Sequence, residues 1–480
     1  NMYYLRIYAL HYMFGMLFAF LMYDWKGKAS GWTGLKKKWP DLILSAAAIA
    51  VAVYVMIDPS SFQTRLSITA NQNDIIFGAL ATVVTIAAAY KLSGKALPIM
   101  AVIFIGYAFL GKYIPGGFGH RGYSLQRVIV NIFGDQGIWG SALATSCNII
   151  FLFILFGAFL EVSGANEIFR DLSISLAGAK RGGPAKIAVI SSAIMGTISG
   201  SAIANVVTTG AFTIPLMKKT GYKKDFAAAV EAVASTGGQF TPPIMGAVGF
   251  VMAEFMCVSY TKVMLAAAIP AFLYYLSLLY SVHLEAKRLG LSGLAKENIP
   301  KAGEVLRARG HLLIPLIVLL ALMFTGYTPL FAAIVAIFVT IPVSFLRRET
   351  RMDLKTIVQA TVEGSRSAIG VGISCIIIGV IIGSVNMTSL GLNFGNLNLR
   401  VVGDGHLFLG GLMVMIMSII LGMGVPGVAA YVIVYVVAVP VLRGVGATEM
   451  AANMFCLIYA CLSNITPPVA MSSTFRGVPI

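Results

Sequence analysis

Apolar residues run through most of this chain in stretches that short polar or charged segments separate. A helix that crosses a bilayer needs about 20 mostly apolar residues. Stretches of about this length fall at 1–23, 41–57, 74–90, 96–111, 137–161, 262–281, 311–326, 329–346 and 356–387. The pattern predicts an all-α polytopic membrane protein.

Four further apolar segments are interrupted. We interpret 184–217 and 406–441 as re-entrant helical hairpins, because their arms of about 15–18 residues are short for a full span. We interpret 225–257 and 449–475 as broken helices, since each contains a pair of prolines. Two amphipathic segments, at about 121–135 and 165–179, are expected to lie in the membrane plane.

The interruptions match between the two halves of the chain. Residues 235–243 read STGGQFTPP and residues 463–468 read SNITPP, so Thr241 and Thr466 are 225 residues apart (466 − 241). Broken helices free backbone groups that lipid cannot satisfy. Matching breaks in two halves indicate the binding site of a secondary transporter.

Composition and charge support a membrane protein and predict its orientation. The chain is 58% hydrophobic and 11% charged, whereas soluble domains carry about 25% charged residues. Its net charge of +16 comes from Lys and Arg in short loops, which indicates positive-inside topology rather than nucleic-acid binding. With the loop at 26–38 in the cytoplasm, most basic residues fall inside, and the exceptions are Arg65, Lys112, Arg121, Arg127, Lys262, Arg400 and Arg443. The two hairpins then open from opposite sides, as in an inverted repeat.

The first hairpin tip offers groups that suit an anionic solute. A helix N-terminus carries positive partial charge and binds carboxylates or phosphates. The candidate solute ligands are Ser199, Gly200, Ser201, Asn205 and Thr208, with Gly424, Val425 and Pro426 in the second half.

The breaks also offer oxygen ligands for a hard cation such as Na⁺. Pro242 and Pro243 remove two N–H donors, which leaves carbonyls upstream, Gly238 among them, without partners. One predicted site comprises Ser199, Ser201, Gly238, Thr241 and Pro242, and its repeat mate comprises Gly422, Gly424, Ser463, Thr466 and Pro467. The alternative is that the prolines only kink the helices.

Glu231 is the acidic residue inside the first broken helix, about three turns before Thr241. An ionisable residue within the membrane suggests function, here the carrying of a proton or the attraction of an ion. The alternative is an ion pair with Lys223 or Lys224 near the cytoplasmic end. Motifs for an ATP motor, a metalloprotease or a serine hydrolase are absent from the sequence, so we expect neither an enzyme nor a bound cofactor beyond the transported ion.

Three stretches carry a family resemblance. Residues 196–210 (GTISGSAIANVVTTG), 421–426 (LGMGVP) and 465–469 (ITPPV) resemble the large-subunit signature of tripartite ATP-independent periplasmic (TRAP) transporters. Residues 230–239 are similar to the branch served by TAXI-type binding proteins, and the first four helices resemble a fused small subunit.

The resemblance implies a multi-pass bacterial inner-membrane importer, driven by Na⁺ or H⁺, that works as an elevator. It implies that a periplasmic TAXI-type binding protein delivers an organic acid such as a dicarboxylate, 2-oxoglutarate or glutamate. A stand-alone anion–sodium symporter is the alternative. Two departures leave the coupling ion open: Gly427 stands where the family often has Thr, and Asn453 where His is common.

The implied domains are a four-helix scaffold at 1–111, a connector with an amphipathic helix at 112–136, and a transport domain at 137–480. The transport domain divides into repeats at about 137–281 and 311–480. The chain begins at Asn1 and ends at Ile480, where the family continues with further helices, so we expect trimming at both ends.

Overall fold

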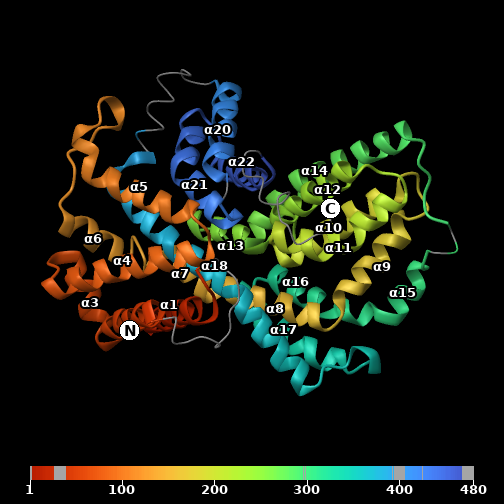
Figure 1. Ribbon diagram of the computed structural model, residues 1–480, viewed down its shortest axis with the longest axis horizontal. Coiled ribbons are helices and arrows are strands. Elements are labelled where there is room, and N and C mark those ends of the chain that lie inside the picture. Colours follow the sequence, from red (N-terminus) through yellow and green to blue (C-terminus); the bar gives the residue numbers. More distant parts are fainter. Residues whose placement is uncertain are drawn as a thin grey trace. The chain divides into compact units, whose positions relative to one another are not determined.

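A computed structural model describes residues 3–25, 39–295, 297, 299–391, 393, 406–423 and 425–466. These residues form α-helices joined by short turns and 3-10 turns (Figure 1). Within these ranges, nine helices are long and apolar enough to cross a membrane. The prediction of an all-helical polytopic protein is therefore confirmed.

The chain divides into two compact units. Unit 1 comprises residues 1–148 and 367–460, and unit 2 comprises residues 149–366 and 461–480. One boundary falls inside the long helix α18 (Leu354–Thr388). The predicted domain boundaries at 111/112 and 136/137 stay predictions.

Unit 1 begins with the helices that the apolar pattern predicts, namely α1 (Tyr3–Met22), α2 (Trp39–Ile57), α4 (Gln72–Leu92) and α5 (Ala96–Leu110). The amphipathic helix α6 (Leu125–Phe133) and the short α7 (Ser141–Thr145) follow, and a π-helical turn at Ser146–Ile150 continues from α7. The pattern missed α3 (Pro59–Ile68), because this short helix is largely polar. The described part of unit 1 ends with the hairpin helices α20 (Leu407–Gly422) and α21 (Gly427–Gly444), and with most of α22 (Glu449–Leu462).

A buried ion pair ties the first helices of unit 1 together. Lys91 Nζ on α4 lies 2.9 Å from Asp41 Oδ1 on α2, and the two side chains are 0% and 3% exposed. The same ammonium donates to the carbonyl of Phe20 on α1 at 2.9 Å. One lysine thus contacts three helices, and its removal would leave Asp41 as an unpaired buried charge.

Unit 2 begins with α8 (Phe151–Val162) and α9 (Ala165–Ala177) and contains the first hairpin and the first broken helix. The hairpin arms are α10 (Gly183–Ser199) and α11 (Ala202–Lys219), which pack against each other and against α12 (Figure 1). The first broken helix consists of α12 (Lys224–Gly237), the 3-10 turn η5 (Gly238–Phe240) and α13 (Gly246–Phe255). The remaining helices are α14 (Tyr260–Arg288), α15 (Ala302–Arg309), α16 (Ile314–Phe324) and α17 (Pro329–Ser344), of which the sequence pattern missed the charged α15.

Small side chains let the helices of the first repeat approach closely. A buried cluster joins α10, α11, α12 and α14 through residues that include Ala185, Ala188, Ala227, Ala234 and Ala286. In membrane proteins, interfaces of this kind gain stability from close van der Waals packing. The hairpin and the first broken helix therefore form one packed body.

Three consecutive elements recur at the offset that the sequence predicts. Helix α11 spans 202–219 and α21 spans 427–444, a shift of 225 residues at both ends (427 − 202, 444 − 219). The same shift converts α12 (224–237) into α22 (449–462), and η5 (238–240) into η9 (Ser463–Ile465). The two halves of the chain therefore share one local fold.

Candidate functional site

The first hairpin breaks over two residues, and local chemistry explains both. Helix α10 ends at Ser199, and Gly200 takes a left-handed backbone with φ +57, which glycine adopts at low cost. Ser201 then caps α11, since its side chain accepts the N–H of Ala204 at 3.3 Å. The predicted ligands Ser199, Gly200 and Ser201 thus form the turn itself.

The hairpin tip lies directly against the break of the first broken helix. A Cβ atom added to Gly200 would lie 2.0 Å from the Cα of Gly246, and one added to Gly196 would lie 2.5 Å from the Cα of Gly238. Only glycine permits such backbone contact. The tip and the break therefore share one region, as the predicted first cation site requires.

Thr241 closes the break with two hydrogen bonds. Its hydroxyl donates to the carbonyl of Gly237 at 2.6 Å, and its N–H donates to the carbonyl of Gly238 at 3.4 Å. The prediction that the Gly238 carbonyl has no partner is therefore wrong, because Thr241 completes a 3-10 turn before Pro242. Each carbonyl and the hydroxyl still keep a lone pair for a cation.

Thr466 repeats this geometry in the second half. Its hydroxyl donates to the carbonyl of Leu462 at 3.0 Å, and its N–H donates to the carbonyl of Ser463 at 3.2 Å. The backbone angles also agree, with φ −96 and ψ 119 at Thr241 and φ −89 and ψ 128 at Thr466. The turn η9 packs against α12 within unit 2, so part of the second break lies beside the first broken helix.

Tyrosines of α14 occupy further carbonyls of the first broken helix. Tyr274 donates to the carbonyl of Val233 at 2.7 Å, Tyr275 to that of Ala234 at 2.8 Å, and Tyr260 to that of Pro243 at 3.0 Å. Sequence reasoning missed these residues. Their signal was present, because hydroxyls inside an apolar span need partners.

Asn205, a predicted solute ligand, lies behind the tip and is 1% exposed. Its Nδ2 donates to the carbonyl of Ser192 at 2.8 Å, while its Oδ1 has no partner among the described residues. Thr208, one turn away from Ala204, donates its hydroxyl to that residue's carbonyl at 2.9 Å. A solute contact from Asn205 would require the tip to open.

Glu231 is fully buried in a cage of hydroxyls. Its Oε1 accepts bonds from Ser192 at 2.7 Å, from Ser235 at 3.1 Å and from Thr209, and its Oε2 accepts from Thr213 at 2.5 Å. We call these five residues the Glu231 cage. The alternative ion pair with Lys223 or Lys224 is wrong for the described part of the chain, where Glu231 bonds to hydroxyls instead.

The candidates of the second hairpin lie in unit 1 and are only partly described. Gly422 ends α20 and its carbonyl accepts the N–H of Val425 at 3.3 Å, and Pro426 precedes the first residue of α21. Gly424 and Pro467 lie outside the described residues. Asn453 on α22 accepts the hydroxyl of the buried Tyr431 at 2.8 Å.

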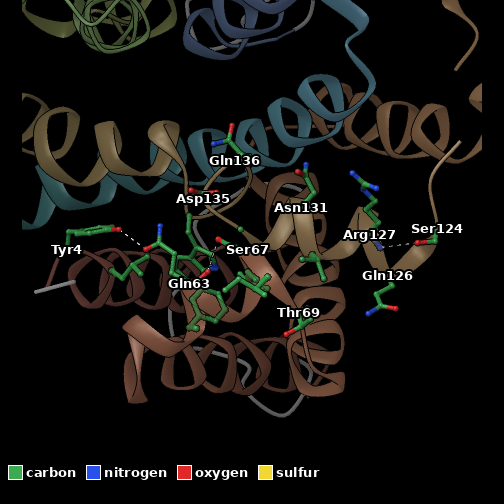
Figure 2. A pocket seen from close by; sticks show the side chains of 18 residues that line it. Tyr4, Gln63, Ser67, Thr69, Ser124, Gln126, Arg127, Asn131, Asp135 and Gln136 are labelled. Atoms are coloured by element: carbon green, nitrogen blue, oxygen red, sulfur yellow. Dashed lines mark hydrogen bonds between the residues drawn. The ribbon is translucent and has the colours of Figure 1, made fainter. Parts of the chain in front are cut away.

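Unit 1 also carries a cavity of about 700 Å³ that the sequence did not predict. Figure 2 shows polar side chains around it, which include Gln63, Arg127, Asn131, Asp135 and Gln136. Its volume matches that of small-molecule sites. None of the predicted solute or cation ligands lines it.

The first repeat combines a broken helix, a buried carboxyl and paired glycine contacts, and its elements α11, α12 and η5 recur as α21, α22 and η9, which fits a transporter permease rather than an enzyme. The chain belongs to the family described as "Tripartite ATP-independent periplasmic transporter, DctM component", whose model matches residues 75–475. The match begins within α4.

Named relatives agree with this assignment. The chain is 25% identical to a putative TRAP transporter large permease protein of Haemophilus influenzae, over 66% of the chain and 74% of the relative. It is 26% identical to the isethionate TRAP transporter permease protein DctMQ of Oleidesulfovibrio alaskensis, over 67% of the chain and 50% of the relative. It is 23% identical to the 2,3-diketo-L-gulonate TRAP transporter large permease protein YiaN of Escherichia coli, over 66% and 74%. The chain thus spans between half and three quarters of the length of these relatives.

Proposed function

We propose that this chain is the membrane permease of a secondary active importer that takes up an organic acid anion from a periplasmic binding protein. Family membership carries the proposal. The solutes named for its relatives, which include C4-dicarboxylates, isethionate, 2,3-diketo-L-gulonate and sialic acid, all bear an acidic group. The resemblance of residues 230–239 favours a TAXI-type binding protein as the partner. The permease itself is proposed to lie in the bacterial inner membrane.

Solute ligands are proposed at each hairpin tip separately. In the first hairpin they are Ser199, Gly200, Ser201, Asn205 and Thr208, and in the second they are Gly424, Val425 and Pro426. Arg and Lys are absent from the described residues of both breaks, so recognition of the anion falls to helix N-termini, hydroxyls and bound cations. Each helix end contributes roughly 0.3–1 kcal/mol. The carrier alone is therefore expected to bind its solute weakly, and selectivity falls mainly to the binding protein.

The coupling cation is proposed at two related sites. The equal geometry of Thr241 and Thr466 supports this, because both breaks present a hydroxyl and a turn of carbonyls at the same place. The first site would comprise Ser199, Ser201, Gly238, Thr241 and Pro242, and the second Gly422, Gly424, Ser463, Thr466 and Pro467. Either Na⁺ or H⁺ drives uptake in this proposal.

The proposed cycle is an elevator, in which residues 184–257 and 406–475 move against a scaffold of residues 1–111 and 356–387. The first hairpin and the first broken helix suit a body that moves as one piece, because backbone contacts and small side chains join them.

Uptake by proteoliposomes tests the dependence on a partner. Purified chain would be given labelled succinate, 2-oxoglutarate or glutamate, with and without a TAXI-type binding protein loaded with the same acid. We expect uptake only when the binding protein is present. Equal uptake without it would favour the stand-alone symporter.

A further inference from the structure

The Glu231 cage can satisfy the carboxyl group in both of its protonation states. An ionised carboxylate offers about four lone-pair positions, and four hydroxyls, those of Ser192, Thr209, Thr213 and Ser235, surround this one. Three of these hydroxyls lie within hydrogen-bond distance of Oε1 and the fourth within that distance of Oε2, so both oxygens of the ionised form find donors. That form is thus stabilised without a cation.

The protonated form also finds partners without movement of any heavy atom. The hydroxyl of Thr213 lies 3.0 Å from the carbonyl of Thr209, and the hydroxyl of Thr209 lies 2.7 Å from the carbonyl of Asn205. When Glu231 carries a proton, either threonine can rotate its O–H to the backbone and accept from the carboxyl. Burial favours the neutral form and the hydroxyls favour the charged form, so opposite effects act on one group.

The second repeat shows that the fold does not need this cage for packing. At the offset of 225 residues, Glu231 corresponds to Cys456, and its partners Thr209, Thr213 and Ser235 correspond to Val434, Ala438 and Ala460. Apolar side chains thus fill the same register in α21 and α22. A buried carboxyl costs desolvation that apolar packing avoids, and the second repeat has no carboxyl at this register, which indicates a role beyond packing.

A small cavity lies beside the cage and contains both polar and apolar side chains. It has a volume of about 120 Å³ and is lined by Asn166, Glu167, Arg170, Ser191, Met195, Thr208, Thr209 and Phe212, from α9, α10 and α11. At about 30 Å³ per water molecule, it has room for roughly four waters. Ser191 is 1% exposed and its hydroxyl has no partner among the described residues, which marks a place for water.

Thr209 connects the cavity to the carboxyl, because it lines the cavity and donates to Glu231. At the other end, Glu167 is exposed. In the predicted topology α9 lies at the cytoplasmic side, so the cavity would open there. A chain of water and one hydroxyl would therefore join bulk solvent to Glu231.

We propose that Glu231 is a proton-binding site of this chain, and that it exchanges its proton with water through the cavity between α9, α10 and α11. The consequence that a proton accompanies the solute rests on the proposed transport function. Proton exchange itself is a property of the purified chain, so the two can fail separately.

Other titratable groups on the packed elements form no recorded bond to Glu231 within the described ranges. Tyr275 on α14 is the group on which Glu231 exerts an electrostatic influence. The other titratable groups on these elements and on α9, which packs against α10, are Lys186 on α10, Lys218 and Lys219 on α11, Lys224 and Asp225 on α12, Tyr260, Lys262, Tyr274, Tyr280, His283, Glu285, Lys287 and Arg288 on α14, Cys461 before η9, and Glu167, Arg170 and Asp171 on α9. Of these, Lys186 is bonded to His283 at 3.1 Å.

Infrared difference spectroscopy tests the proposal directly. The full chain in lipid would be titrated from about pH 5 to about pH 9, and the carbonyl band of protonated Glu231 identified by its loss in Glu231→Gln. We expect the band to disappear reversibly as pH rises. Glu254→Gln, which removes an exposed carboxyl, should leave the band in place. The proposal would be overturned if the band kept the same intensity across the whole pH range. It would also be overturned if no such band appeared at any pH.

Two further variants separate the cage from the cavity. Thr213→Val removes a hydrogen-bond donor to the ionised carboxylate. The midpoint, which is the pH at which half of the Glu231 carbonyl band is lost, should therefore rise by about one unit. Ser191→Val should slow hydrogen–deuterium exchange of the Glu231 carboxyl several-fold without moving the midpoint, whereas Ser384→Val, at a buried serine of unit 1, should not. An unchanged exchange rate in folded Ser191→Val would refute the cavity route. Thermal unfolding would confirm that each variant folds.

Discussion

At the residue scale, two threonines define the breaks. Thr241 and Thr466 make the same pair of hydrogen bonds to carbonyls three and four residues earlier. Motif matching in the sequence predicted both threonines. The motif could not predict that each threonine would itself donate hydrogen bonds to the carbonyls assigned to an ion. Whether such a turn closes depends on backbone angles, which the sequence does not show.

Replacing either threonine with valine keeps the shape and removes one oxygen. We expect Thr241→Val and Thr466→Val to weaken uptake mainly at low concentration of the coupling ion, by roughly tenfold in apparent ion affinity. Thr340→Val is the matched control, because Thr340 is buried on α17 and also donates to a carbonyl four residues earlier. Unchanged ion dependence in both test variants would reject the assigned cation sites.

A second prediction concerns the contact between Gly200 and Gly246. Gly200→Ala should destabilise the protein and abolish uptake, because its Cβ would overlap the Cα of Gly246 at 2.0 Å. Gly94→Ala controls for backbone strain, since Gly94 also has positive φ but nothing lies within 4 Å of an added Cβ. Gly94→Ala should cost only about 1 kcal/mol. Equal melting temperatures for the two variants would show that the glycine contact does not form.

At the element scale, the apolar and the amphipathic helices were predictable, whereas the short polar helices α3 and α15 were not. The predicted hairpin at 184–217 corresponds to α10 and α11, and the predicted broken helix at 225–257 to α12, η5 and α13. Helices α3 and α15 escaped detection because neither has an apolar stretch. The hydroxyls of the α14 tyrosines signalled a need for partners, but no local pattern identifies those partners as carbonyls of the first broken helix.

The ion pair between Asp41 and Lys91 gives a prediction about the packing of α1, α2 and α4. Lys91→Met leaves a buried carboxylate alone, so it should lower the free energy of unfolding by about 3–5 kcal/mol. The double variant Asp41→Leu with Lys91→Met removes both charges and should recover most of that loss. Denaturant unfolding in detergent measures both. A double variant no more stable than Lys91→Met would argue against a buried pair.

At the scale of the whole molecule, the repeat of α11, α12 and η5 as α21, α22 and η9 is the feature that most favours transport. Internal repeats with matching broken helices are typical of secondary transporters. The copies differ in chemistry, because the carboxyl cage occurs in the first repeat and apolar residues stand at its place in the second. We therefore expect ion coupling to depend unequally on the two halves.

The central claim is that this chain moves an organic anion by using an ion gradient. The most direct measurement is accumulation of a labelled acid in nucleotide-free proteoliposomes that contain the chain and are supplied with a loaded binding protein. The gradients of Na⁺ and H⁺ would be imposed separately. The account predicts that the acid accumulates above its external concentration under at least one inward gradient, and that accumulation collapses when the gradient is dissipated. Simple equilibration of the acid, unaffected by either gradient, would contradict it.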